Sequence, residues 1–337
     1  MKQLLLYKTL FLFCFFHSLV FSQSNISSEK SLFETNDNPK LYKTKVIWLE
    51  NFHIDRDFPA MSGPTKKKVI HLDDNNAPNA FTWIKSVTVD VMGPNKQSEP
   101  LALLCHAWVT LKDRSSYSDN QSGLITISEG MGESLFPKGY GMYIKGSTEP
   151  NIELLAQALN EDPHFKMDLS YRFTIKYLSN PTVDKHGPQL LKPLTQVSAA
   201  ALGPKLQFKD GQLCETELAP GENPNMSNHF LVPPGKHSYR QTLAGSMFQR
   251  ANTIHFIKLH LHQFGESISF YDRTENKLLW VGKAYYKKGH IDRVDSYSSE
   301  GGIPVFFDHQ YEIVSTYNNT SKKNAEGMAV LRMYIEK

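Results

Sequence analysis

Two histidines separated by one residue are the side chains of this sequence with the clearest potential for chemistry. His260 and His262 lie in the apolar segment 254–262. Because successive side chains of a strand alternate between its two faces, both imidazoles should point the same way and His255 the other way. Met328, in a later strand-like segment, could supply a third ligand, and its thioether is a soft donor that suits copper, above all Cu(I). The residue types therefore predict a mononuclear copper site at His260, His262 and Met328.

The spacing of these residues is a weak signal when it is taken alone. A chain of 337 residues with 13 histidines contains about half a His-x-His pair by chance. Met328 is one of ten methionines, and methionine ordinarily fills gaps in a core. The alternative interpretation is a pair of buried histidines whose nitrogens are satisfied by hydrogen bonds.

Other catalytic and binding motifs are missing from the sequence. It contains no Gly-x-Ser-x-Gly, no phosphate-binding glycine loop, no His-Glu-x-x-His and no Cys-x-x-Cys, so the usual signatures of several hydrolase, nucleotide-binding and redox classes are absent. The formal net charge of +3 provides no basic footprint for nucleic acid. We therefore expect no nucleic-acid partner.

The first 22 residues have the order of a secretory signal. Lysines come first, the apolar run 10–21 follows, and small and polar residues end the segment,. The apolar run is too short for a transmembrane helix, which needs about 20 residues, and no second run of that length follows. We expect an exported protein, periplasmic or extracellular, with no transmembrane segment in the mature chain. Residues 23–41 have the composition of a flexible leader.

Export would leave two cysteines, Cys105 and Cys214, in an oxidising compartment,. They form either one disulfide, which would close a loop of roughly 110 residues, or two separate buried thiols. The disulfide is our expectation, although the sequence does not show that the two residues approach each other.

Short strand-like segments dominate the rest of the chain. They are separated by turn residues and not by helices, which is typical of antiparallel sandwiches. The one helical candidate, Ile152 to Leu159, is short and could also be a strand. We predict an all-β protein of two tandem antiparallel β-sandwich (jelly-roll-like) domains, residues 42–200 and 201–337.

Residues 229–335 resemble the C-terminal domain of the copper type II, ascorbate-dependent monooxygenases, the peptidylglycine α-hydroxylating and dopamine β-monooxygenase family. The resemblance is carried by the Val-Pro-Pro-Gly turn at 232–235, the His-Leu-His at 260–262, the segment 311–320 and Met328. It implies that one copper ion per chain, the one that binds oxygen, is held by His260, His262 and Met328. The chain also resembles a bacterial branch of exported monooxygenase-like proteins.

The N-terminal half departs from the pattern of that family. The family holds a second copper, which stores an electron, with a His-His pair on one strand and a later histidine. Here the first place contains Cys105-His106 and the second, residues 156–160, contains no histidine. Only His106 matches, either as a relic ligand or as a hydrogen-bonded strand histidine. The resemblance therefore implies one copper, a degenerate second site and an external reductant.

The sequence is compatible with three functions. The first is a copper enzyme that hydroxylates an organic substrate, either a small molecule or a peptide or glycan, with oxygen. The second is a non-catalytic envelope or extracellular module that binds a glycan, peptide or protein, because fold does not decide function. The third is a copper carrier. Oxygen consumption with ascorbate would separate the enzyme from the other two.

Overall fold

The chain folds almost entirely into β-strands, as the sequence predicts. The computed structural model describes residues 42–58, 62–72, 81–112, 125–145, 150–179, 191–205, 225–248 and 252–336. Within these ranges the only helices are two 3-10 turns, η2 (Leu101–Leu103) and η3 (Gly245–Phe248). None of the helices in these ranges is long and apolar enough to cross a membrane. The all-β fold class is confirmed.

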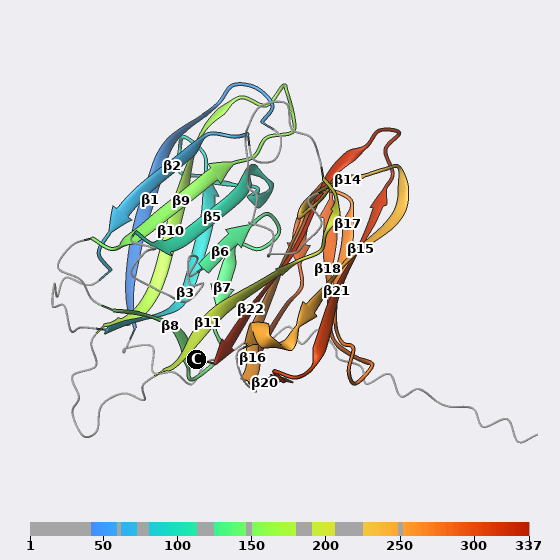
Figure 1. The fold of residues 1–337 in the computed structure, drawn as a ribbon. Helices are drawn as coiled ribbons and strands as arrows, with labels where there is room; N and C mark the ends of the chain where they lie inside the picture. The colour runs from blue at the N-terminus through green and yellow to red at the C-terminus, as the bar shows by residue number, and fades with distance from the viewer. Residues whose placement is uncertain are drawn as a thin grey trace, which may run out of the picture. The chain divides into compact units, whose positions relative to one another are not determined.

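The first ten strands, called here the N-terminal strands, form two facing sheets (Figure 1). One contains β1, β10, β3 and β8 in this order, and the other contains β2, β9, β5 and β6. Their facing side chains form a first core, which includes Phe52, Tyr171 and Phe173. The bounds are β1 (Lys43–Ile54), β2 (Thr65–Ile70), β3 (Phe81–Met92), β4 (Ser98–Glu99), β5 (Leu104–Leu111), β6 (Ile125–Ser128), β7 (Glu133–Leu135), β8 (Tyr140–Lys145), β9 (Ile152–Ala158) and β10 (Met167–Ser179).

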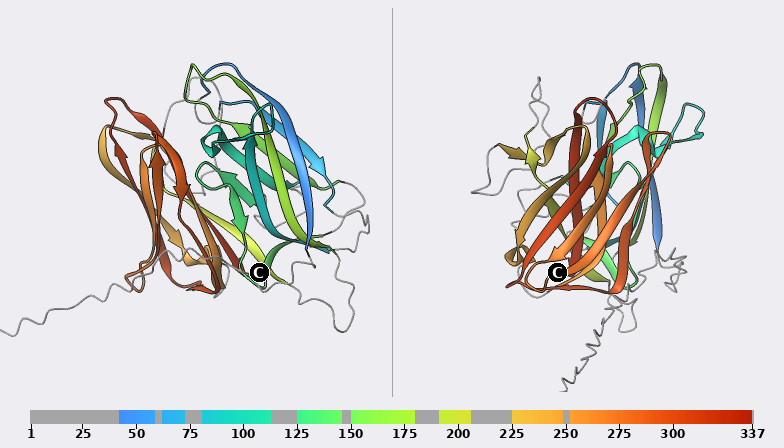
Figure 2. Two further views of the ribbon diagram at one scale, coloured as in Figure 1. Left: turned by 180° about the vertical axis from the view of Figure 1, so that it is seen from behind. Right: turned by 90° about the vertical axis from the view of Figure 1, so that its right-hand side faces the viewer.

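The remaining strands, called the C-terminal strands, lie beside one another (Figure 2), and their buried side chains form a second core. A five-stranded sheet has the order β15-β21-β17-β18-β19, and β11, β22, β16 and β20 lie side by side in another. The bounds are β11 (Lys192–Ala200), β12 (Gly203–Pro204), β13 (Met226–Ser227), β14 (His229–Val232), β15 (Gly235–Ala244), β16 (Asn252–Leu261), β17 (Gly265–Asp272), β18 (Lys277–Lys287), β19 (His290–Val294), β20 (Ser296–Val305), β21 (Gln310–Asn319) and β22 (Ala325–Glu336).

Strand β11 connects the two sets of strands. It pairs in parallel with β8 and antiparallel with β22, so one sheet continues from β1 to β20. The described residues belong to one compact unit. The predicted division between residues 200 and 201 falls where β11 ends. These domain limits stay a prediction.

The helical candidate at 152–159 is a strand. Its residues form β9, whose Leu154 and Ala156 are fully buried and which pairs on both sides, with β2 and with β5. Pairing on two edges satisfies its backbone groups, so the helical preference of its Leu and Ala residues does not decide its conformation.

Strand β16 contributes to both cores because its side chains alternate between its faces. Ile257, Leu259 and Leu261 belong to the second core, whereas Phe256 belongs to the first. A bulge between Ile254 and Phe256 sets this phase. The face that contains Phe256 must therefore also present His260 toward the N-terminal strands.

Candidate metal centre

The sheet register places Met328 directly beside His262. His260 pairs with Val330 and Leu261 with Ala329, and the His262 backbone N–H donates to the Met328 carbonyl at 3.1 Å. On the other side of β22, Met328 pairs with His229 of β14. Residues directly opposite each other in an antiparallel sheet share a face. His262, Met328 and His229 therefore form a row across three strands.

Glu326 completes this row because it lies two residues before Met328 on β22 and so shares its face. The His229 imidazole donates from Nδ1 to Glu326 Oε1 at 2.8 Å, and His262 Nδ1 lies 3.6 Å from the same oxygen. One ligand atom from each of His229, His262 and Glu326 lies within 4.8 Å of the other two. This is the spacing of groups that can share a metal ion.

His260 extends the group toward the N-terminal strands. Its ring centroid lies 5.1 Å from that of His262, and its Nε2 lies 3.3 Å from Nε2 of His106 on β5. The Sγ atom of Cys105 lies 3.1 Å from Nδ1 of His106. We call the whole set the histidine cluster: His106, His229, His260, His262, Glu326 and Met328.

Burial keeps three imidazoles of the cluster neutral, those of His106, His260 and His262. It lowers the pKa of His262 to about 3, against the opposing effect of the Glu326 carboxylate. Burial, together with the nearby Arg332, lowers the pKa of His106 to about 3. Burial and the neighbouring His106 and His262 hold the pKa of His260 well below its ordinary value. Neutral imidazole is the form that binds a metal.

Glu326 remains a carboxylate in spite of its partial burial. Burial alone would raise its pKa, but the hydrogen bond from His229 lowers it below its ordinary value. An ionised carboxylate accepts the Nδ1–H of His229 and so fixes the orientation of that ring. Glu326 therefore both orients a neighbouring imidazole and presents a negative ligand.

The rings of His260 and His262 bury nitrogens that have no hydrogen-bond partner: Nδ1 of His260 and both nitrogens of His262. Both residues are 7 % exposed, so water cannot freely replace the missing partners. An unsatisfied buried polar group costs about 1–3 kcal/mol. An ion bound by these rings would offset part of this cost, because each imidazole binds an ion through one nitrogen.

The structure brings together the residues predicted from the sequence and adds two more. His260, His262 and Met328 are neighbours across β16 and β22, and His106 approaches His260. His229 and Glu326 were not predicted, although the alternation of β22 already places residue 326 on the face of residue 328. Cys214 lies outside the described residues, so its disulfide with Cys105 stays a prediction.

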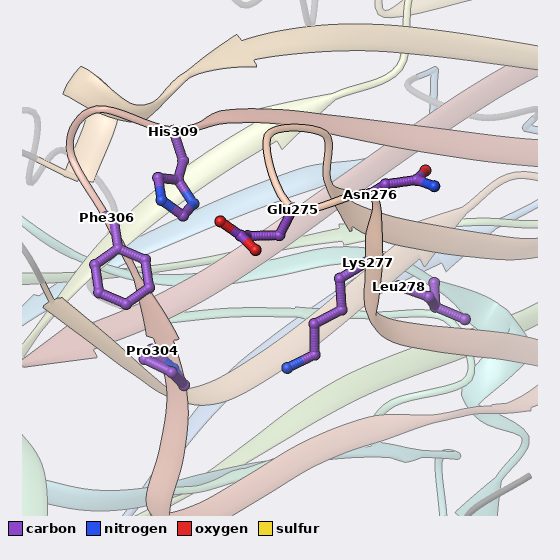
Figure 3. A pocket seen from close by; sticks show the side chains of 7 residues that line it. All are labelled: Glu275, Asn276, Lys277, Leu278, Pro304, Phe306 and His309. Carbon is purple, nitrogen blue, oxygen red and sulfur yellow. The ribbon is translucent and has the colours of Figure 1, made fainter. Parts of the chain in front are cut away.

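A separate hollow opens between the β17–β18 turn and the β20–β21 connection (Figure 3). The hollow is lined by Glu275, Asn276, Lys277, Leu278, Pro304, Phe306 and His309. None of these residues belongs to the histidine cluster. Figure 3 shows the Glu275 carboxylate turned toward the His309 imidazole. His309 Nδ1 contacts Asp272 Oδ2 at 2.6 Å, and the ring centroid of Phe306 lies 4.8 Å from that of His309.

We expect His309 to titrate above its ordinary pKa of about 6.5. The hydrogen bond to Asp272 and the charge of that carboxylate raise the pKa, against the effect of desolvation. The ion pair therefore stabilises the fold below the unfolded-state pKa, and this contribution is lost as the pH rises through the folded-state pKa. NMR titration should show the raised value, and Asp272→Asn should lower it toward 6.5. A wild-type value at or below 6.5 would contradict the expectation.

Fold and cluster together define an all-β protein with a buried, histidine-rich candidate metal centre. No family model matches the sequence, and neither does any curated protein. The chain is similar to the solved structure of the STIV MCP, with a TM-score of 0.37 and 10% identity over 87% of this chain and 95% of that one. It is also similar to PNGase F, a glycosylasparaginase from Flavobacterium meningosepticum, with a TM-score of 0.35 and 7% identity over 87% of this chain and 96% of that one. Likenesses this weak carry no statement about function, so the resemblance to copper monooxygenases stays a prediction.

Proposed function

We propose that the chain is an exported metal-binding protein that holds one copper ion in the histidine cluster through His260, His262 and Met328. The observation that carries this proposal is the His262 ring, whose two nitrogens are both buried without a hydrogen-bond partner. Buried polar atoms in proteins are nearly always paired. A ligand role would give one of these two nitrogens a partner.

Copper is favoured over other metals by the types of the donors. Met328 is 3% exposed and lies between His262 and His229 in the sheet register. A thioether together with imidazoles suits copper and is a poor set for Mg or Ca. When bound, copper supplies a redox centre that can react with oxygen. The proposed activity is oxidation of an organic substrate with oxygen and an external reductant.

The protein residues of the centre would exclude water and fix the imidazoles. His229, His260, His262 and Met328 are all buried, whereas the Glu326 side chain is 21% exposed. Glu326 is therefore the member of the row that is closest to solvent, and a substrate would approach the centre from its side. Its hydrogen bond with His229 fixes the tautomer of that ring.

A second candidate is a site for zinc or iron at His229, His262 and Glu326. The mutual spacing of these three ligand atoms, within 4.8 Å, favours it. Two histidines and one carboxylate are a known set for both catalytic zinc and non-haem iron. In this alternative Met328 would be a core residue and would not touch the ion.

Metal analysis of the full chain tests the proposal. Protein purified from copper-containing medium should retain about one copper ion per chain, and ascorbate should then drive oxygen consumption above background. Oxygen consumption at background with copper bound would support a binding module, or a copper carrier if the ion exchanges with a chelator within minutes. A chain that repeatedly emerges without metal, and that takes up neither Cu(I) nor Zn(II), would contradict metal binding altogether.

A further inference from the structure

The N-terminal strands place one imidazole directly against the candidate metal centre. His106 lies on β5, where it pairs with Ser128 of β6 and Gln157 of β9. It is 2% exposed, and its ring points across to His260 of β16. The two residues come from different sheets, so their contact is a tertiary one.

The closest atoms of these two rings are the nitrogens that can both act as ligands. Nε2 of His106 lies 3.3 Å from Nε2 of His260. Two nitrogens bound to one tetrahedral ion at about 2.0–2.1 Å each are separated by roughly 3.3 Å. A hydrogen bond between one N–H and one lone pair gives a similar distance, so the geometry fits a direct contact and equally a shared ion.

The His262 ring helps to distinguish these two arrangements. His106 Nδ1 lies 3.1 Å from the Cys105 sulfur, which can hold the ring in place as a partner outside the ligand set,. Nδ1 of His260 is buried with no hydrogen-bond partner, and since Nε2 makes the contact in both arrangements, it stays unpaired in both. A hydrogen bond between the two Nε2 atoms would also leave both nitrogens of His262 unpaired. An ion among the three rings would pair one nitrogen of each ring, including one of His262.

We propose that His106 is a further ligand of the metal centre, so that the bound ion joins strand β5 of the N-terminal strands to strands β16 and β22. This inference rests on the proposed function and adds a ligand from outside the C-terminal strands. The ion would reinforce a contact that already exists along the same face of β16. There Lys258 donates to the Thr126 carbonyl and to the Ser134 hydroxyl, and Phe256 packs edge-on against Phe136.

The test compares Cu(I) binding by the full-length wild type, His106→Ala and a matched control, His255→Ala. His255 is likewise a buried histidine, but it lies on β16, stacks on Tyr140 with 4.0 Å between ring centroids and does not belong to the cluster. Chelator competition should show that His106→Ala lowers the Cu(I) affinity by at least about 10-fold. Loss of a partner outside the ligand set already costs about this much, so loss of a ligand should cost no less. His255→Ala should bind as the wild type does.

X-ray absorption of the Cu(I)-loaded proteins distinguishes a ligand from a positioning residue. The number of imidazoles bound to copper should fall by one in His106→Ala and stay constant in His255→Ala. His106→Asn serves as a second variant if the alanine protein does not fold by circular dichroism. If the His106 variant binds Cu(I) with the wild-type affinity and imidazole number, the inference is wrong while the proposed function stands. If the wild type itself binds no Cu(I), the proposed function fails first.

Discussion

His262→Ala is expected to emerge without metal from a purification in which the wild type retains one ion. His262 occupies the middle of the histidine cluster. Its ring centroid lies 5.1 Å from that of His260 and 5.6 Å from that of His229, and its backbone N–H donates to Met328. Both the copper site and the alternative zinc or iron site contain this residue. Its loss should therefore lower the affinity for any of these metals by more than the roughly 10–100-fold that an outer partner contributes.

The stability of the metal-free protein should change far less than the affinity. Truncation of a buried side chain ordinarily destabilises because it leaves a cavity, but His262→Ala also removes two buried nitrogens without hydrogen-bond partners. These effects oppose each other, so we expect the metal-free variant to lose no more than about 2 kcal/mol of unfolding free energy. The wild type should gain about 2.7 kcal/mol at a metal concentration of 100 times Kd, and the variant should gain none.

Metal content by elemental analysis and urea unfolding with and without Cu(I) measure both parts of this expectation. His255→Ala is the matched control, since it truncates a buried histidine of the same strand outside the cluster. If His262→Ala retains metal at the wild-type level, the ion is bound elsewhere and the assignment of the centre is wrong.

Much of the fold was predictable because it depends on local patterns. Segments of β-branched and aromatic residues with turns between them predicted the strands. The one ambiguous segment, 152–159, is a strand because it pairs with a neighbouring strand on each of its edges. Such pairing involves residues far apart in the sequence, from 65–70 and 104–111. Local propensity does not contain this information.

The same distinction applies to the histidine cluster. His260 and His262 are two residues apart, so the alternation of a strand places them on one face without knowledge of the fold. His229 enters the cluster only because β14 pairs with β22, and His106 only because β5 lies against β16. Glu326 is the exception, because its position two residues before Met328 was sufficient to place it beside that residue.

The identity of the metal depends on whether Met328 or Glu326 is a ligand, and two substitutions separate these cases. Met328→Leu conserves side-chain volume, so the cost in stability should be below about 1.5 kcal/mol. It removes the soft sulfur, so Cu(I) affinity should fall by about 10-fold or more while Zn(II) affinity stays the same. Met333→Leu is the control, since Met333 is a fully buried methionine of the same strand that belongs to the second core.

Glu326→Gln should produce the opposite result. The amide keeps the shape of the side chain but removes the negative charge that the hydrogen bond from His229 stabilises. Zn(II) prefers an anionic oxygen ligand more than Cu(I) does, so Zn(II) affinity should fall by about 10-fold or more and Cu(I) affinity much less. Anaerobic competition with chelators of known affinity measures both metals for both variants. If Met328→Leu leaves Cu(I) binding unchanged and Glu326→Gln weakens both metals, the centre is His229, His262 and Glu326. The copper assignment would then be wrong, because a site without the thioether has no reason to prefer Cu(I).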